Sequence, residues 1–404
     1  MSAHRLITRR HCLPLAYGMV ALPGRLAAAP APLKITRFVT RKFIISGRDY
    51  LFLEIETDGD ITGLGEGSLP GRAAITEQAI RWLEPHLIGL DPAGIDDHWN
   101  RIYHQLSRWR DGSVMMTALA AVDIALWDLE AKRLGVPVWR LTGASSAKPL
   151  PVYYSHWSQD IRPRTPAALK ELAIKTREQG WKAVKWVVPQ AATERERLDQ
   201  AVAECRAVRE AGLDFGLEMW EKFTVRSAIE FARAVAPFNP LFIEEPVLRE
   251  SPQSLAEVAA ASPVPVATGE GLLTRYDFRH LLDHKGARII QPDVVHCGGI
   301  TEIRRIASLG ETYGVEISPH MWYGPVAHAA SIHAMSSVRN FWMQEWDAVH
   351  DRLFVELTRG THTLPKAGAV TPSSQPGLGI EMDWVQWEGR FPYTGQATRR
   401  PGGR

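Results

Sequence analysis

Three short segments, Asp214-Phe-Gly-Leu-Glu218, Phe242-Ile-Glu244 and Val266-Ala-Thr-Gly-Glu270, decide the fold class of this sequence. Each is a run of apolar or small residues, typical of a buried β-strand, and each closes on a glutamate. Successive glutamates are 26 residues apart, the length of one strand, one helix and their connections. This repeat predicts neighbouring parallel strands that carry a carboxylate at the same height.

The same alternation of strand and helix continues on both sides of these segments. The β-rich segments are residues 152–157, 183–188, 214–219, 241–245, 264–270, 289–293, 315–320 and 341–345. Helix-compatible stretches separate them, for example residues 166–179, 194–211, 225–236 and 254–261. Eight strands alternating with helices predict a (β/α)8-type barrel. A doubly wound open sheet is the rival, but no Gly-x-Gly-x-x-Gly motif follows the first strand to support it.

The part before the barrel has strands first and helices afterwards, which is typical of an α+β domain. A β-rich segment at 48–57 returns through a turn into 61–67, and the longest helical pattern spans 113–134. We expect an α+β domain at residues 33–150 and the barrel at 151–360. Residues 361–404 are expected to pack back onto the first of these domains.

Composition and charge exclude several classes of function. A length of 404 residues suits a barrel of about 250 residues with an accessory domain. The formal net charge of +2 argues against a nucleic-acid partner, and no apolar run reaches the ~20 residues that span a bilayer. Cys12, Cys205 and Cys297 match neither a zinc spacing nor a disulfide framework. We expect a small-molecule partner, with no nucleic acid and no membrane.

Residues 1–32 differ from the rest of the chain. Thr8-Arg9-Arg10 precedes a mildly apolar stretch at 12–22, and Leu26-Ala-Ala-Ala29 follows. This order resembles a twin-arginine export signal, which predicts a periplasmic protein. The alternative is a disordered extension or a start assigned too early, which predicts a cytoplasmic one.

Three carboxylates in one small volume repel each other, and some of them would be protonated unless a cation lies between them. A ligand set made of oxygen atoms favours Mg²⁺ or Mn²⁺ over Zn²⁺. A single glutamate at the end of a strand is more often a salt-bridge partner than a metal ligand. Glu245, next to Glu244, is an example of a carboxylate at a strand end that needs no metal-binding role. Three in register predict a site for one Mg²⁺ formed by Glu218, Glu244 and Glu270.

The next three strands end on Asp293, His320 and Glu345. Aspartate and histidine on neighbouring strand ends can hydrogen-bond, which fixes the imidazole tautomer and raises its basicity. We expect His320 to remove the proton α to a substrate carboxylate, and a protonated Glu345 to donate to the resulting enediolate. Lys185 would supply positive charge on the opposite side. The alternatives are a structural histidine and an ordinary ion pair of Lys185 at the barrel mouth.

Several motifs resemble those of the enolase superfamily, and more closely those of its acid-sugar dehydratases. Motifs similar to the galactonate dehydratase group are Pro240-Leu-Phe-Ile-Glu-Glu-Pro-Val-Leu248, Ala267-Thr-Gly-Glu270, Gln291-Pro-Asp293, Gly298-Gly-Ile-Thr-Glu302 and Ser318-Pro-His320. Motifs that also resemble the mannonate dehydratase group are Gly63-Leu-Gly-Glu-Gly67, Gly71-Arg72 and Ala121-Val-Asp-Ile-Ala-Leu-Trp-Asp128.

The resemblance covers residues 33–390 and implies a fold like that of mandelate racemase and muconate lactonizing enzyme. In such a fold the N-terminal domain caps the barrel and is completed by the C-terminal segment. The resemblance also implies a homo-oligomer, Mg²⁺ on the three glutamates, and a base formed by the Asp293 and His320 pair.

Two positions depart from the family pattern. The galactonate and mannonate dehydratase groups carry a histidine two residues after the first metal ligand, and here that position is Trp220. Val187 stands where a second lysine would follow Lys185. His320 could return its proton to the leaving hydroxyl, or a residue such as His156 could act as the acid. Either mechanism leaves the identity of the sugar acid open.

Candidate substrate contacts are the arginines and aromatic residues expected near the barrel mouth, since arginine suits a polyhydroxy carboxylate. They are Arg48, Arg72, Trp109, Arg110, Trp220 and His156. Each could equally be a surface charge or a core aromatic. The function that these residues favour is Mg²⁺-dependent dehydration of a sugar acid to a 2-keto-3-deoxy acid. The alternatives are a racemase or epimerase, and a carboxylate-binding protein without turnover.

Overall fold

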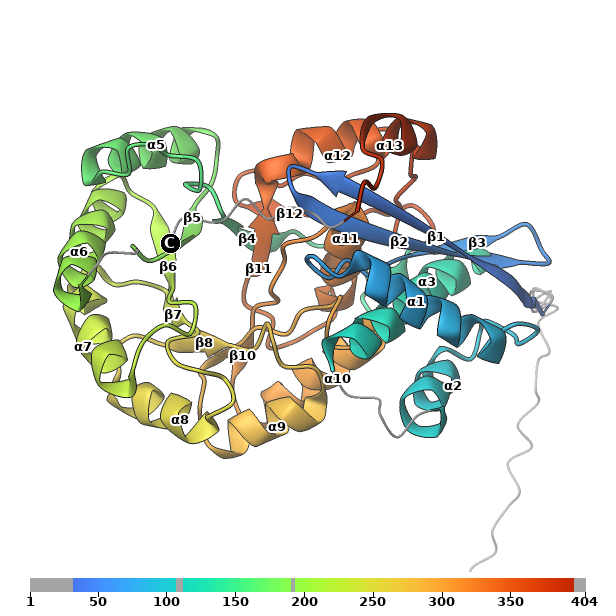
Figure 1. The fold of residues 1–404 in the computed structure, drawn as a ribbon, viewed down its shortest axis with the longest axis horizontal. Coiled ribbons are helices and arrows are strands. Elements are labelled where there is room, and N and C mark those ends of the chain that lie inside the picture. Colours follow the sequence, from blue (N-terminus) through green and yellow to red (C-terminus); the bar gives the residue numbers. More distant parts are fainter. Residues whose placement is uncertain (1–31, 107–111, 190–192, 396–404) are drawn as a thin grey trace, which may run out of the picture. The chain divides into compact units, whose positions relative to one another are not determined.

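The N-terminal part of the chain forms an antiparallel sheet packed on helices. The computed structural model describes residues 32–106, 112–189 and 193–395 (Figure 1). The sheet has the order β1-β2-β3, in which both pairs are antiparallel. Its strands are β1 (Ile35–Ile45), β2 (Arg48–Thr57) and β3 (Thr62–Glu66). The helical elements are α1 (Ala73–Leu83), η1 (Glu84–His86), α2 (Ile95–Asn100), η2 (Arg101–Gln105), α3 (Ser113–Arg133) and α4 (Val138–Leu141).

Eight parallel strands follow and close into a barrel. Their hydrogen-bonded order is β10-β9-β8-β7-β6-β5-β4-β11, and a parallel bridge between Ile317 and Phe341 joins the two ends. The strands are β4 (Leu150–Ser155), β5 (Ala183–Val187), β6 (Asp214–Glu218), β7 (Phe242–Glu244), β8 (Val266–Thr268), β9 (Ile289–Ile290), β10 (Glu316–Ile317) and β11 (Gln344–Asp347). The predicted barrel with an α+β domain is therefore confirmed.

Helices cover the outside of the barrel, as Figure 1 shows for the arc from α5 to α10. Most of them pack one apolar face on the strands and leave the other to solvent, whereas every residue of α11 (Pro325–Met335) is buried. These elements are α5 (Pro166–Glu178), α6 (Glu194–Glu210), α7 (Val225–Val235), η3 (Ala236–Phe238), α8 (Pro252–Ala261), α9 (Arg275–Asp283), α10 (Gly299–Thr312) and α11 (Pro325–Met335). Within the described residues, no helix has the length and apolar character needed to cross a membrane.

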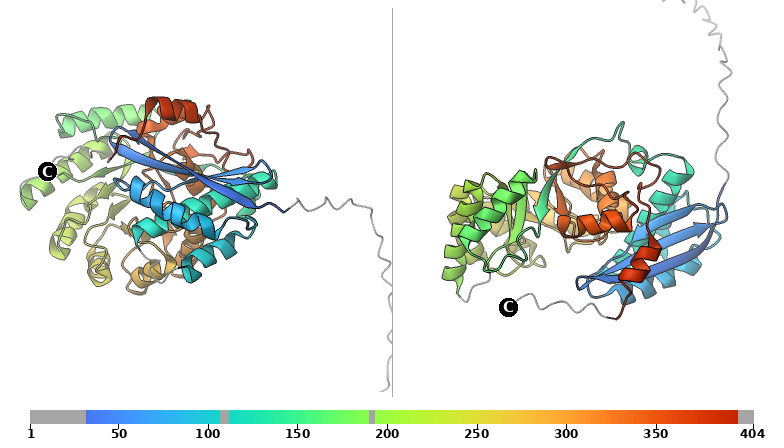
Figure 2. Two further views of the ribbon diagram at one scale, coloured as in Figure 1. Left: turned by 45° about the vertical axis from the view of Figure 1, so that its right-hand side comes forward. Right: turned by 90° about the horizontal axis from the view of Figure 1, so that it is seen from above.

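The C-terminal segment contacts both the barrel and the N-terminal sheet. Its elements are η4 (Ala348–His350), α12 (Asp351–Leu357), β12 (Ala369–Val370) and α13 (Trp384–Arg390). Strand β12 pairs with β4, whereas α13 lies against the N-terminal sheet (Figure 2). The buried Trp387 ring is 5.0 Å from the rings of both Phe43 and Phe52. The domain boundaries expected above stay a prediction.

The export signal expected in residues 1–32 falls, apart from Pro32, outside the described residues. Among the cysteines that the structure describes, Cys205 and Cys297 are buried and free.

Candidate active site

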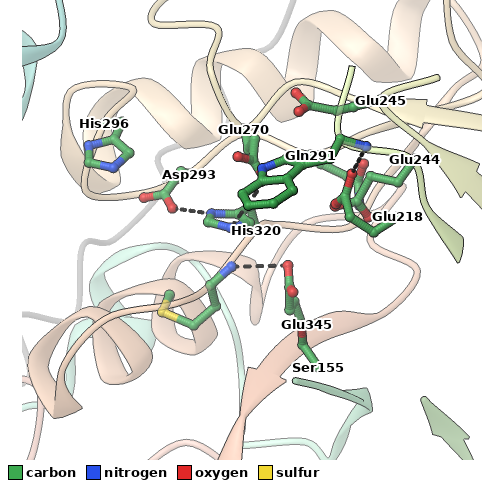
Figure 3. Close-up of polar contacts among 12 residues, drawn as sticks. Ser155, Glu218, Glu244, Glu245, Glu270, Gln291, Asp293, His296, His320 and Glu345 are labelled. Atoms are coloured by element: carbon green, nitrogen blue, oxygen red, sulfur yellow. Dashed lines mark hydrogen bonds and ion pairs between the residues drawn. The ribbon is translucent and has the colours of Figure 1, made fainter. Parts of the chain in front are cut away.

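The three glutamates of the predicted metal site come together at the carboxyl ends of β6, β7 and β8. Glu218 and Glu244 are direct register partners, so their strands end at the same height. One carboxylate oxygen from each of Glu218, Glu244 and Glu270 lies within 4.8 Å of the other two (Figure 3). Glu218 and Glu244 are buried, and Glu270 is partly exposed. The cluster therefore opens to solvent on the Glu270 side.

The ammonium group of Lys185 lies between the carboxylates at the barrel mouth. Its Nζ contacts Glu244 Oε1, and it lies 2.9 Å from Glu345 Oε1 and 3.6 Å from Glu218 Oε2. Burial opposes its charged form, but the carboxylates outweigh burial and raise the pKa of Lys185 well above its usual value. These contacts favour the positively charged form of Lys185.

Asp293 and His320 form the predicted pair. Nδ1 of His320 lies 2.6 Å from Oδ2 of Asp293, whose Oδ1 accepts the Val295 N–H at 2.7 Å. An imidazole whose Nδ1–H donates to a carboxylate keeps its Nε2 lone pair free. That Nε2 is 3.3 Å from Oε2 of Glu270. The ring therefore faces the glutamate cluster with the nitrogen that a base would use.

Glu345 lies on the other side of the cluster, at the second residue of β11. It is buried, and its Oε2 accepts the Met321 N–H at 3.3 Å. Lys185 Nζ lies beside the other oxygen, so Glu345 accepts a hydrogen bond in its contacts with both Met321 and Lys185. The predicted hydrogen-bond donation by a protonated Glu345 stays a prediction.

The electrostatics of the cluster fit a bound cation. Glu218, Glu244, Glu270, Asp293 and Glu345 place five carboxylates around Lys185 and His320. Burial raises the pKa of Glu218 well above its usual value, and repulsion by Glu244 adds to the effect. Burial also raises the pKa of Glu270. Excess negative charge in a buried site is what a divalent cation bound through oxygen ligands would compensate.

The pKa of His320 also fits a cation bound in this cluster. Burial lowers it, but Glu270, Glu345 and Asp293 outweigh burial and raise the pKa to about 10. A histidine with that pKa is protonated at neutral pH and cannot accept a proton. A cation on Glu270 would offset the largest of these raising charges and lower the pKa toward the range of a working base.

Gln291 belongs to the cluster, although the sequence analysis gave it no role. Its Nε2 donates to Glu244 Oε2 at 2.5 Å, which leaves Oε1 of Glu244 for Lys185 or a cation. Its position one residue after β9, in the Gln291-Pro-Asp293 motif, was the signal that could have identified it.

Trp220 and His156, which the sequence analysis considered in place of the missing family residues, have different environments in the structure. Trp220 adopts a positive φ of 55°, and its backbone N–H donates to Glu218 Oε1 at 2.7 Å. Trp220 as a residue is 45% exposed, and its contact with the glutamate is made by the main chain. His156 follows β4, and burial lowers its pKa to about 4. It is a neutral imidazole at neutral pH.

The residues predicted to contact the substrate have different environments in the structure. Arg48 forms an ion pair with Asp347, and its guanidinium lies 4.3 Å from the ring centroid of Trp322. The rings of Trp322 and His156 are 5.8 Å apart, so Arg48 and His156 share one corner of the barrel mouth. Arg72 is exposed at the start of α1, and its guanidinium donates to the Pro70 carbonyl. Trp109 and Arg110 lie outside the described residues.

Both parts of the chain match known families. Residues 28–143 match the mandelate racemase / muconate lactonizing enzyme N-terminal domain, and residues 168–386 match the enolase C-terminal domain-like family. The chain is 36% identical to the D-galactonate dehydratase of Variovorax paradoxus over 87% of its length and 92% of the relative's. It is 35% identical to that of Pectobacterium atrosepticum over the same shares of the two chains.

Solved structures agree with the sequence relatives. The mandelate racemase/muconate lactonizing enzyme from Jannaschia sp. CCS1 superimposes with a TM-score of 0.81 at 28% identity, over 90% of this chain and 98% of that one. The enzyme of the same description from a Sulfitobacter species gives 0.81 at 29%, over 90% and 96%. The sequence relatives support an enzyme of the hydro-lyase class. The chain belongs to the enolase superfamily, in the branch of mandelate racemase and muconate lactonizing enzyme.

Proposed function

We propose that this protein is a Mg²⁺-dependent dehydratase that converts a sugar acid of the aldonate type into its 2-keto-3-deoxy product. The observation that carries the proposal is the Asp293–His320 pair, in which the second imidazole nitrogen, Nε2, lies 3.3 Å from Glu270 Oε2. An oriented base beside a cluster of carboxylates is the arrangement that proton removal next to a substrate carboxylate requires. The dehydratase relatives support elimination as the reaction that follows.

One cation per subunit would be held by Glu218, Glu244 and Glu270, with Gln291 and the main chain of Trp220 orienting two of these ligands. When bound, Mg²⁺ supplies positive charge that stabilises the enediolate form of the substrate carboxylate. Lys185 adds a second positive charge on the β5 side of the same position. Arg48 and His156 are proposed to contact the hydroxyl groups of the substrate.

His320 removes the α-proton through Nε2, and Asp293 stabilises the imidazolium that forms. The C–O bond at the 3-position then breaks, and the departing hydroxide takes a proton to leave as water. His320 can return its own proton in a syn elimination, so that a single base suffices. His156 is a neutral imidazole, so it can donate a hydrogen bond to a hydroxyl on the opposite face but is not proposed as the acid. The remaining enol becomes the 2-keto acid.

A screen of purified protein with Mg²⁺ against aldonic, aldaric and uronic acids tests the proposal. Formation of a 2-keto acid from one of them is the expected result. Exchange of the α-proton with deuterium from solvent without net dehydration would favour an epimerase. Ligand binding without either reaction would favour a non-catalytic carboxylate-binding protein.

The substitution His320→Asn tests the assignment of the base. We expect it to reduce dehydration and α-proton exchange at least 1,000-fold, because general-base catalysis contributes about 10²–10⁴-fold and the imidazole acts in two steps. Mg²⁺ binding should be preserved, since His320 is not among the proposed ligands. Turnover that survives the substitution would show that the base is another residue.

Homo-oligomerisation remains a proposal, which analytical ultracentrifugation can test by measuring the sedimentation of the purified protein.

A further inference from the structure

A second hydrogen-bonded pair lies next to Asp293 and His320. His296 is three residues after Asp293, and Tyr323 is three residues after His320. Nε2 of His296 lies 2.5 Å from Oη of Tyr323, which parallels the 2.6 Å contact of the first pair. In Figure 3, His296 lies beyond Asp293, on the side away from His320 and the glutamates. The loops after β9 and β10 are therefore joined by two side-chain contacts. In each loop, the residue of the second contact follows the residue of the first by three positions.

Thr117 connects the second pair to the N-terminal domain. Its Oγ1 lies on α3 and is 2.8 Å from Nδ1 of His296. All three side chains are buried. Burial lowers the pKa of His296, so the ring is neutral and carries one N–H. One N–H between two hydroxyl groups gives each ring nitrogen a partner, because one hydroxyl donates to the ring and the other accepts from it.

Tyr323 connects this chain of hydrogen bonds to His320. The two rings have centroids 6.1 Å apart and planes at 72°, an edge-to-face contact. Asp293 holds one nitrogen of His320 but does not by itself prevent the ring from tilting. The Tyr323 ring lies edge-to-face beside the imidazole, in a position to oppose such a tilt. Small errors in the position of a catalytic group are costly, on the order of 10²-fold for 1 Å.

The loop that carries Tyr323 is held by the N-terminal domain at a second point. Glu66, at the end of β3, accepts the Gly324 N–H at 2.7 Å and the Ala327 N–H at 2.9 Å. Gly324 directly follows Tyr323. The N-terminal domain therefore fixes the loop through its backbone and, by way of Thr117 and His296, through the tyrosine hydroxyl.

We propose that Thr117, His296 and Tyr323 are positioning residues that orient His320 only when the N-terminal domain is seated on the barrel. The proposal rests on the function proposed for His320. None of the three needs to touch the substrate. Their effect is on the orientation of the base, so they act on the rate of proton removal rather than on binding.

A double-mutant cycle with Tyr323→Phe and Thr117→Val tests whether the chain acts as a unit. We expect each substitution to lower kcat about 10-fold to 100-fold with KM unchanged, as for groups that orient a reacting residue. The double variant should be no slower than the slower single one, because either change already breaks the chain. Effects that multiply, or a rise in KM with kcat unchanged, would overturn the proposal.

Matched variants separate this role from loss of any buried hydroxyl. Thr117→Ser keeps the hydroxyl and should restore kcat to within about 3-fold of the wild type, because Ser donates and accepts as Thr does. Tyr313→Phe removes a hydroxyl that binds Asp283 on the outside of the barrel, and Thr176→Val removes one that binds the Leu172 carbonyl. Both should leave kcat unchanged. A Ser variant as slow as the Val variant would contradict the proposal.

Nitrogen-15 NMR of the histidine rings gives a readout that does not depend on turnover. We expect Tyr323→Phe to shift the ring resonances of both His296 and His320, and Tyr313→Phe to shift neither. A change at His296 alone would overturn the proposal. If no sugar acid is turned over or exchanged, the proposed function fails, whereas the coupling between Tyr323 and His320 is still decided by the spectra.

Discussion

At the scale of single residues, the site depends on how a few carboxylates share positive charge. Both oxygens of Glu244 have partners, because Lys185 contacts one of them and Gln291 donates to the other. Burial opposes its ionised form, but Lys185 outweighs burial and lowers the pKa of Glu244. Glu244 is therefore ionised in the folded protein and available as a cation ligand.

Substitutions at this glutamate and at its neighbour should weaken Mg²⁺ binding by different amounts. Glu244→Gln removes a charged ligand, and we expect a loss of affinity of more than about 100-fold in isothermal titration calorimetry. Gln291→Leu removes only the group that orients the ligand, for which about 10-fold to 100-fold is usual. Glu230→Gln, on the exposed side of α7, is the matched control and should bind Mg²⁺ normally. Equal affinities in all three variants would refute the predicted ligand set.

At the scale of elements, the contact between β3 and α11 depends on a buried carboxylate. Burial raises the pKa of Glu66 to about 7. Between about pH 4.5 and pH 7 the unfolded chain has lost this proton while the folded protein keeps it. The stability contributed by this group is therefore present at low pH and decreases as the pH rises through that window.

Glu66→Gln should remove this part of the pH dependence. From pH 5 to pH 8 the wild type should lose up to about 3 kcal/mol of unfolding free energy that the variant does not lose, since each unit of pKa corresponds to 1.36 kcal/mol. Urea unfolding of both proteins at the two pH values measures the difference, and other titrating groups cancel in the comparison. Parallel pH profiles would show that Glu66 does not titrate in this range.

Two aromatic residues of helix α13, Trp384 and Trp387, contact the N-terminal sheet, and Trp387 is the more deeply buried of the two. Trp387 is fully buried, and its Nε1 donates to the Leu357 carbonyl at 3.0 Å. Trp387→Ala should lower the unfolding free energy by about 3 to 5 kcal/mol through lost burial and a residual cavity. Val385→Ala, at a side chain that is 79% exposed, should cost less than about 0.5 kcal/mol. Similar costs in urea unfolding would mean that α13 does not depend on this contact.

At the scale of the whole molecule, cation binding and folding should be linked. The three glutamates come together only when β6, β7 and β8 are paired, so the cation binds the folded chain and not the unfolded one. At a free Mg²⁺ concentration of 100 Kd the stabilisation is about 2.7 kcal/mol. Calorimetry should show a higher Tm with Mg²⁺, reversal by a chelator, and no such rise for Glu244→Gln. A Tm that does not respond to Mg²⁺ would contradict the predicted site.

Much of the barrel and of its carboxylate cluster was predictable because both follow from periodicity. A parallel β/α repeat brings the carboxyl end of every strand to one face, so Glu218, Glu244 and Glu270 had to lie together. The same reasoning placed His320 beside Asp293 on the next strands. The departures at Trp220 and Val187 were also visible in the sequence, since they require only a count from the first ligand and from Lys185.

The amino-acid sequence by itself thus determined the fold and the group of side chains at the barrel mouth. Only the tertiary structure decided which partner each side chain has. Arg48 and Asp347 are 299 residues apart, and Glu66 is 258 residues from Gly324. No repeat in the sequence relates such positions, because the contacts depend on how the N-terminal domain sits on the barrel and on the reach of individual side chains. The chain from Thr117 through His296 to Tyr323 arises in the same way.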